Sequence, residues 1–112
     1  MTQVAVIHTA FEDTPRTVAL VEVGERTGTE ALEYAFRWTQ NIMDSWSLKM
    51  PEDGNDAVTV MAELPVSKRT GQTMGLRSTS VGDQMLLGNK KYRVAGFGFK
   101  EIEQKEVDSV AD

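Results

Sequence analysis

Residues 27–44 read TGTEALEYAFRWTQNIMD, and this stretch decides the fold class. It opens with Thr27 and, three residues later, Glu30, the S/T-x-x-E form of a capping box that satisfies unpaired backbone N–H groups at a helix start. Apolar residues then recur at steps of four, three and four: Ala31, Ala35, Trp38 and Ile42. This spacing predicts a helix reaching to about Asp44, whose apolar stripe needs a sheet to cover it.

Three β-type runs surround this helix in the first two thirds of the chain. Residues 4–7 and 17–23 are apolar and rich in β-branched side chains, and their spacing predicts an antiparallel pair. Residues 57–64 alternate apolar and polar side chains and end at Pro65, which is typical of a third strand.

The last two strands are expected at 84–87 and 91–99. They are joined by Gly88-Asn89, the residue pair of a type II′ hairpin turn. A tight turn at 80–83 leads into the first of them. The glycines Gly96 and Gly98 indicate either a bulge within the second strand or a close backbone approach near Phe97 and Phe99.

These elements predict an α+β domain: an antiparallel sheet of about five strands with one long helix packed on one face, in the order β-β-α-β-β-β. Residues 1–100 form this single domain, and residues 101–112 form an acidic, flexible tail. The predicted core brings together nine side chains from the helix and the strands: Leu32, Ala35, Trp38, Ile42, Val18, Leu20, Val58, Val60 and Val94.

Composition excludes several classes of site. A chain of 112 residues supports one hydrophobic core. Cysteine is absent and His8 is the single histidine, which excludes disulfides, thiolate metal sites and clustered histidine ligands. The hydroxyls of Ser78, Thr79 and Ser80 have no identifiable activating base. We therefore expect no enzymatic activity, no catalytic residue, no metal and no cofactor. Without a leader-like start or a long apolar run, we expect a cytoplasmic protein that does not enter a membrane.

Charge is distributed in blocks along the chain. Residues 1–65 carry a balance of −7, residues 66–100 a balance of +6, and residues 101–112 a balance of −4, within a net charge of −5. Such blocks either steer an oppositely charged partner or neutralise one another within the fold. The sequence does not decide whether the basic block is an exposed patch.

The sequences RSTSVGD (77–83), YRV (92–94) and GFGF (96–99) accompany the predicted C-terminal hairpin. Together they resemble that region of small uncharacterised proteins carried by phages and plasmids, and more distantly the YodL-like module of bacterial mobile elements. The helix sequence AFRWTQNI (35–42), followed by SW (45–46), is similar to the preceding helix of the same proteins. The resemblance covers about half of the chain. It implies an origin on a mobile element in a bacterial host, hence the host cytoplasm, and carries no established chemistry.

A nucleic-acid interface is one reading of the basic block. The loop residues Lys68 and Arg69, then Arg77, and the hairpin residues Lys90, Lys91 and Arg93 could neutralise phosphates across residues 68–93. The acidic isoelectric point near 4.9 opposes this unless the basic side chains are gathered on one face.

A protein-binding surface is the other reading. Trp46 follows the helix in a polar connection, where it is either a core plug or an interface anchor. Likewise, Arg77 either pairs with Asp83 inside the fold or joins an exposed surface. The full candidate surface comprises Trp46, Lys68, Arg69, Arg77, Ser78, Thr79, Ser80, Lys90 and Lys91.

The function we expect is that of a non-enzymatic accessory protein of a phage or plasmid that binds a bacterial host protein, in a host-takeover or anti-defence role. A nucleic-acid-binding module and a small phage structural or assembly protein are the alternatives. The identity of the partner and the oligomeric state, including a homo-oligomer, stay open.

Overall fold

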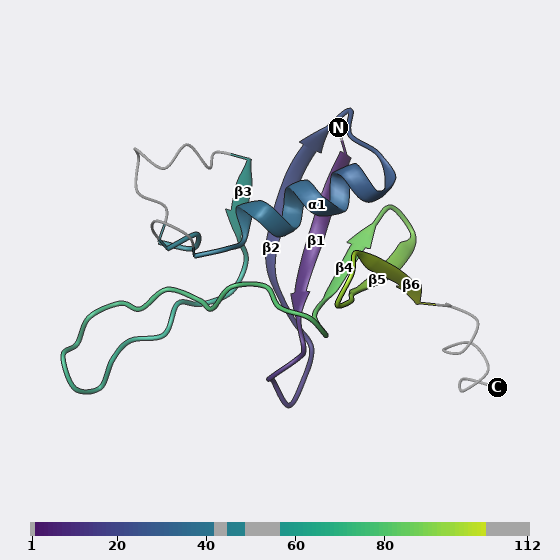
Figure 1. The fold of residues 1–112 in the computed structure, drawn as a ribbon. Helices are drawn as coiled ribbons and strands as arrows, with labels where there is room; N and C mark the ends of the chain where they lie inside the picture. Colours follow the sequence, from purple (N-terminus) through teal and green to yellow (C-terminus); the bar gives the residue numbers. More distant parts are fainter. Residues whose placement is uncertain (1, 42–44, 49–56, 103–112) are drawn as a thin grey trace.

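The computed structural model describes residues 2–41, 45–48 and 57–102. Its elements, in chain order, are β1 (Thr2–His8), β2 (Arg16–Gly24), α1 (Gly28–Trp38), β3 (Val58–Val60), β4 (Gln84–Leu87), β5 (Lys90–Val94) and β6 (Phe99–Ile102). The strands form one sheet in the order β3-β2-β1-β4-β5-β6, with every neighbouring pair antiparallel. The predicted α+β class with a helix on an antiparallel sheet is therefore confirmed (Figure 1).

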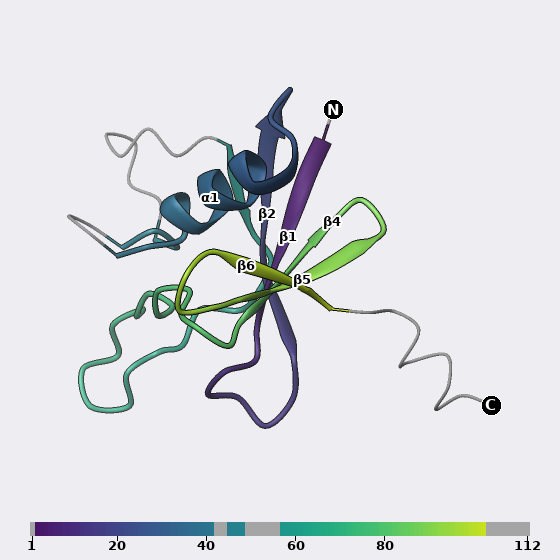
Figure 2. The ribbon, with the colours of Figure 1, turned by 45° about the vertical axis from the view of Figure 1, so that its right-hand side comes forward.

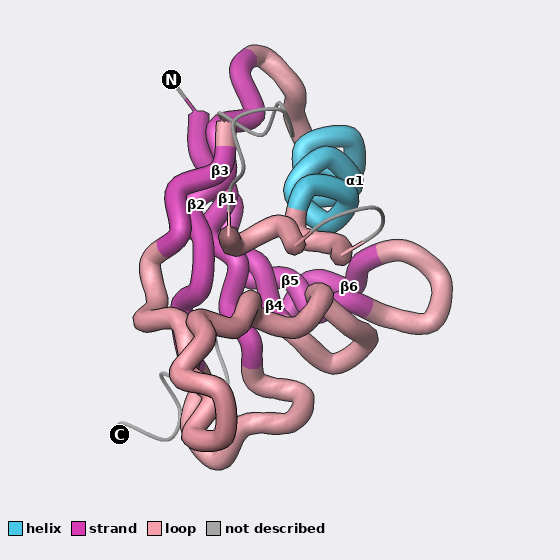
Figure 3. The backbone as a smooth tube through the Cα atoms, turned by 90° about the vertical axis from the view of Figure 1, so that its left-hand side faces the viewer, coloured by secondary structure: helices cyan, strands magenta, loops and turns pink. Residues whose placement is uncertain are grey.

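The helix covers one face of the sheet. Seen edge-on in Figure 3, α1 lies on one side of β1, β2 and β3, and no described helix lies on the other side. Figure 2 shows β5 and β6 running at a large angle to β1 and β2, which is the twist expected of a sheet built from right-twisted strands. The result is a two-layer domain in which one sheet face packs a helix and the other does not.

The sheet has six strands rather than the predicted five, because residues 91–99 are not one strand. Strand β5 ends at Val94, and the chain turns back with a hydrogen bond from the Ala95 N–H to the Gly98 carbonyl oxygen, 2.9 Å. Gly98 takes a φ of 69°, which suits glycine in a tight turn. The glycines that indicated a bulge thus make a second hairpin. Its return strand, β6, reaches Ile102, beyond the expected domain end at residue 100.

The helix is shorter than predicted, ending at Trp38 rather than near Asp44. The Thr39 carbonyl accepts the Thr79 N–H at 3.0 Å, and the Thr39 hydroxyl donates back to the Ala35 carbonyl at 2.9 Å. The predicted capping box is also wrong. Gly28 takes a φ of 54°, and the Thr27 side chain makes no capping hydrogen bond. Residues 42–44, the last three of the predicted helix, lie outside the described part.

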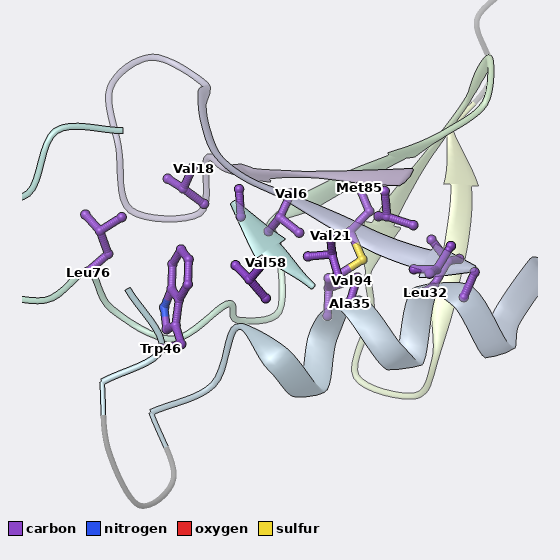
Figure 4. Packing of buried hydrophobic residues seen from close by; sticks show 14 residues of the cluster. Val6, Val18, Val21, Leu32, Ala35, Trp46, Val58, Leu76, Met85 and Val94 are labelled. Carbon is purple, nitrogen blue, oxygen red and sulfur yellow. The ribbon is translucent and has the colours of Figure 1, made fainter. Parts of the chain in front are cut away.

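The core lies between α1 and the sheet face that it covers. Of the nine predicted core residues, five are confirmed as buried: Val18, Leu32, Ala35, Val58 and Val94. Trp38 and Val60 are partly buried against this core, and Ile42 lies outside the described residues. The prediction for Leu20 is wrong, because it pairs with Ala5 on the face turned away from the helix. Figure 4 shows Trp46 and Leu76 closing one end of the core and Leu32 near the other.

Candidate functional site

A buried carboxylate, Asp83, holds together two segments that are distant in sequence. Its side chain is fully buried and accepts backbone N–H groups from Thr9 at 2.8 Å, Ala10 at 2.9 Å and Ser80 at 2.8 Å. The Asp83 N–H closes the predicted turn onto the Ser80 carbonyl at 3.0 Å, with Gly82 at a φ of 99°. The loop after β1 is therefore fastened to the turn before β4.

Arg77 supplies the charge that this buried carboxylate needs. Its guanidinium donates to both Asp83 oxygens at 2.7 and 2.8 Å, and to both Glu12 oxygens at 3.1 and 2.8 Å. Burial raises the pKa of Asp83, but the bonds from Arg77 and the three backbone N–H groups outweigh it and lower that pKa to about 2. The expected Arg77–Asp83 pair is thus confirmed, and Arg77 is held in a four-bond clamp between two carboxylates.

His8 begins a chain of buried hydroxyls beside this pair. Its Nε2 lies 3.0 Å from the Thr79 hydroxyl, the Thr79 hydroxyl donates to the Thr39 hydroxyl at 2.8 Å, and Thr39 donates to the Ala35 carbonyl. Because each hydroxyl has one proton, Nε2 must be the donor to Thr79. Desolvation by burial lowers the pKa of His8, with the nearby Asp83 charge opposing that shift.

This grouping of Thr, His and Asp does not have the geometry of a nucleophilic triad. In a triad the histidine accepts the nucleophile's proton on one ring nitrogen and is oriented by the carboxylate through the other. Here the same atom, His8 Nε2, faces both the Thr79 hydroxyl and Asp83 Oδ2, the latter at 3.9 Å, and it donates to the hydroxyl rather than accepting from it. All three side chains are buried. The network joins α1 to the strands.

Trp46 and its neighbours after α1 form hydrogen bonds to the segment that precedes the 80–83 turn. Trp46 is 3% exposed, and its indole N–H donates to the Arg77 carbonyl at 2.9 Å. Asn41 receives the Trp46 backbone N–H and donates its amide to the Leu76 carbonyl, while Gln40 donates to the Thr79 carbonyl. Trp46 is a core plug, and it is not available on the surface as an interface anchor.

The nine predicted surface residues therefore do not form one surface. Five of them belong to the packing just described: Trp46, Arg77, Ser78, Thr79 and Ser80. Lys68 and Arg69 are exposed in the loop between β3 and β4, which Figures 1 and 2 place on the opposite side of the molecule from the β4–β5 hairpin that carries Lys90 and Lys91. A single basic patch spanning residues 68–93 is not formed.

The sheet face turned away from α1, here called the open face, brings other residues together. Register places Ala5 directly opposite Leu20 on one side and Leu86 on the other, with Ile7 two residues along β1. Ile102 lies on this face at the sheet edge. None of these side chains belongs to the core, and each is partly exposed. The open face therefore presents an apolar strip to solvent.

A row of cations flanks this strip. Lys91 pairs directly opposite Leu86, and Arg93 pairs opposite Lys100, so all three cations share the open face. Of these, the sequence had indicated Lys91 and Arg93 as phosphate contacts, and Lys91 alone as part of the candidate surface. The alternation of Lys91 and Arg93 was visible in the sequence, but Lys100 joins them only through the β5–β6 hairpin, which was not foreseen.

Among residues 2–41, 45–48 and 57–102, no three His, Cys, Asp or Glu side chains gather as metal ligands. In the same described part, no helix has the length and apolar character that a membrane span requires. No protein-family model, curated protein or solved structure matches this chain.

Proposed function

We propose that this chain is a non-enzymatic accessory protein of a phage or plasmid, and that it binds a bacterial host protein through its open face. One observation carries the binding role: an apolar strip of Leu20, Ala5 and Leu86 crosses three adjacent strands on a face that no described element covers. In a two-layer domain the uncovered face is usually polar, and a contiguous exposed apolar patch is typical of an interaction surface.

The origin on a mobile element is supported only by the resemblance, which residues 35–42, 45–46, 77–83, 92–94 and 96–99 carry. In the fold, residues 77–83 and 96–99 form the turn held by Asp83 and the β5–β6 turn with the strand residue that follows it. Both segments stabilise the fold. The resemblance therefore supports the proposed origin, and the open face supports the proposed binding role.

A protein partner is favoured over nucleic acid by the composition of the open face. Base stacking needs exposed aromatic rings beside the cations. The aromatic residues on the strands of Lys91, Arg93 and Lys100 are Tyr92 and Phe99, and both pack on the core side. Phe97 is fully exposed, but it lies in the β5–β6 turn, outside the strands that carry the cations. The apolar strip itself offers nothing to phosphate oxygens.

The test is recovery of a host protein from bacterial lysate by the immobilised chain, with and without nuclease. Leu86→Asp places a carboxylate in the apolar strip without touching the core, and should abolish recovery because the contact must then desolvate a charge. Leu48→Asp, the same change at a leucine that is 40% exposed and outside the sheet, is the matched control and should retain recovery.

Two results would contradict the proposal. Recovery that disappears with nuclease would identify nucleic acid as the bridge. Equal recovery by wild type, Leu86→Asp and Leu48→Asp would show that the contact lies away from the open face.

A further inference from the structure

The dimensions of the apolar strip restrict what can lie on it. Leu20, Ala5 and Leu86 stand in one row across β2, β1 and β4. Neighbouring strands are about 4.8 Å apart, so the row is about 10 Å wide. An α-helix with its side chains is about 10–12 Å across. One helix lying over β1 would therefore cover the strip, including Ile7, which lies along its length.

Backbone hydrogen bonding also favours a helix. The N–H and C=O groups of the central strands β1, β2 and β4 are paired within the sheet, so the face above them offers side chains and no backbone partners. An extended peptide lying there would bury unpaired backbone groups, whereas a helix satisfies its own. The opposite face of the same strands already accepts α1, which lays the small residues Ala31 and Ala35 against it.

The charges on the open face lie on one side of the apolar strip, so they would contact only one flank of a bound helix. Lys91 lies one strand beyond Leu86, and Arg93 and Lys100 lie beside it on β5 and β6. Among the described residues, the acidic side chains in or next to these strands do not share the open face: Glu101 pairs with Tyr92 on the core side, and Asp83 is buried against Arg77. On the far flank, beyond Leu20, the strip is bordered by Thr59 and, further along β2, by Glu22. The face is thus cationic on one side only.

We infer that the open face binds an amphipathic α-helix of the host protein, with its apolar stripe over Leu20, Ala5 and Leu86 and its carboxylates along one flank over Lys91, Arg93 and Lys100. This inference rests on the proposed function and specifies its partner. The apolar strip supplies the burial, and the cations fix which way round the helix lies.

The test uses the full, isotopically labelled chain and three probes, followed by nuclear magnetic resonance. The first is a synthetic helical peptide with a leucine stripe and glutamates along one flank. The second has lysine in place of each glutamate, and the third is a single-stranded thymidine oligonucleotide. The glutamate peptide should shift the signals of Ala5, Ile7, Leu20 and Leu86 and saturate, while the other two leave these signals in place.

Charge reversal on the protein gives the matched comparison. Arg93→Glu should weaken binding of the glutamate peptide by about tenfold, because it turns an attractive contact into a repulsive one. Arg69→Glu makes the same change in the loop between β3 and β4 and should leave the affinity unchanged. Equal binding of the lysine peptide, open-face shifts caused by the oligonucleotide, or equal effects of the two charge reversals would each overturn the inference.

Failure of this inference is distinguishable from failure of the proposed function. If Leu86→Asp abolishes recovery of a host protein while Arg93→Glu does not weaken the glutamate peptide, the open face binds a protein of different chemistry. If Leu86→Asp leaves recovery unchanged, both proposals fall.

Discussion

Asp83→Asn should destabilise the fold by about 3 kcal/mol, which is a large part of the total stability of a domain of this size. The amide keeps the shape of the side chain but removes the charge that Arg77 faces. Its NH₂ group replaces one of the two oxygens and cannot accept a hydrogen bond, so either the Ser80 N–H or the N–H groups of Thr9 and Ala10 lose their acceptor. Urea unfolding at neutral pH measures the change, which should appear as a lower midpoint at an unchanged slope.

Glu12→Gln is the matched control for this prediction. It also removes a carboxylate from Arg77, but Glu12 is 26% exposed and holds no turn, so the expected loss is about 0.5–1 kcal/mol. Equal losses in the two variants would contradict the central role given to Asp83.

The stability difference between wild type and Asp83→Asn should also depend on pH. The pKa of Asp83 falls from an ordinary value of 3.8 to about 2 in the folded protein, a shift of about 2 kcal/mol in favour of folding. A lowered pKa gives stability that is fully present above pH 3.8 and is lost as pH falls toward 2. The difference in stability between wild type and Asp83→Asn should therefore narrow over that range.

Trp46→Ala should lower the free energy of unfolding by about 3–5 kcal/mol, because it empties one end of the core and leaves the Arg77 carbonyl without its indole donor. The ring also meets the His8 imidazole edge-to-face, with centroids 6.3 Å apart. Thermal unfolding measures the loss, expected as a fall of about 4–8 °C for each kcal/mol in a domain of this size.

Trp38→Ala makes the same substitution at a tryptophan that is only partly buried, at the last position of α1. It should lower the free energy of unfolding by clearly less than Trp46→Ala does. If Trp46→Ala unfolds no more readily than Trp38→Ala, then Trp46 does not close the core. The surface role that its sequence position allowed would then have to be reconsidered.

Features set by neighbouring residues could be predicted from the sequence. The antiparallel pair β1–β2, the strand at 84–87 and the turn at 80–83 all follow from local alternation and turn residues. Strand β6 was missed because glycine at 96 and 98 is equally compatible with a bulge and with a turn. Only the pairing of β6 with β5 distinguishes them.

Features set by distant residues could not be predicted. The helix ends at Trp38 because the Thr39 carbonyl is taken by Thr79, forty residues away. Asp83 and Arg77 are close in sequence and their pairing was foreseen, whereas Glu12 joins them across 65 residues. Which residues share the open face depends on the register of six strands, and no local sequence pattern predicts that register. Its apolar members sit among residues that look like ordinary core positions, as the wrong placement of Leu20 shows.

The central claim is that the open face is the surface that a host protein covers, and the lysines of the chain offer a direct test without any substitution. Lys91 and Lys100 lie on the open face, whereas Lys68 lies in the loop between β3 and β4 and Lys90 at the β4–β5 turn. The immobilised chain would be acetylated in buffer and after incubation with nuclease-treated bacterial lysate, and modification at each lysine compared. The account predicts that lysate protects Lys91 and Lys100 and leaves Lys68 and Lys90 reactive. Protection confined to Lys68, or equal at all four lysines, would contradict it.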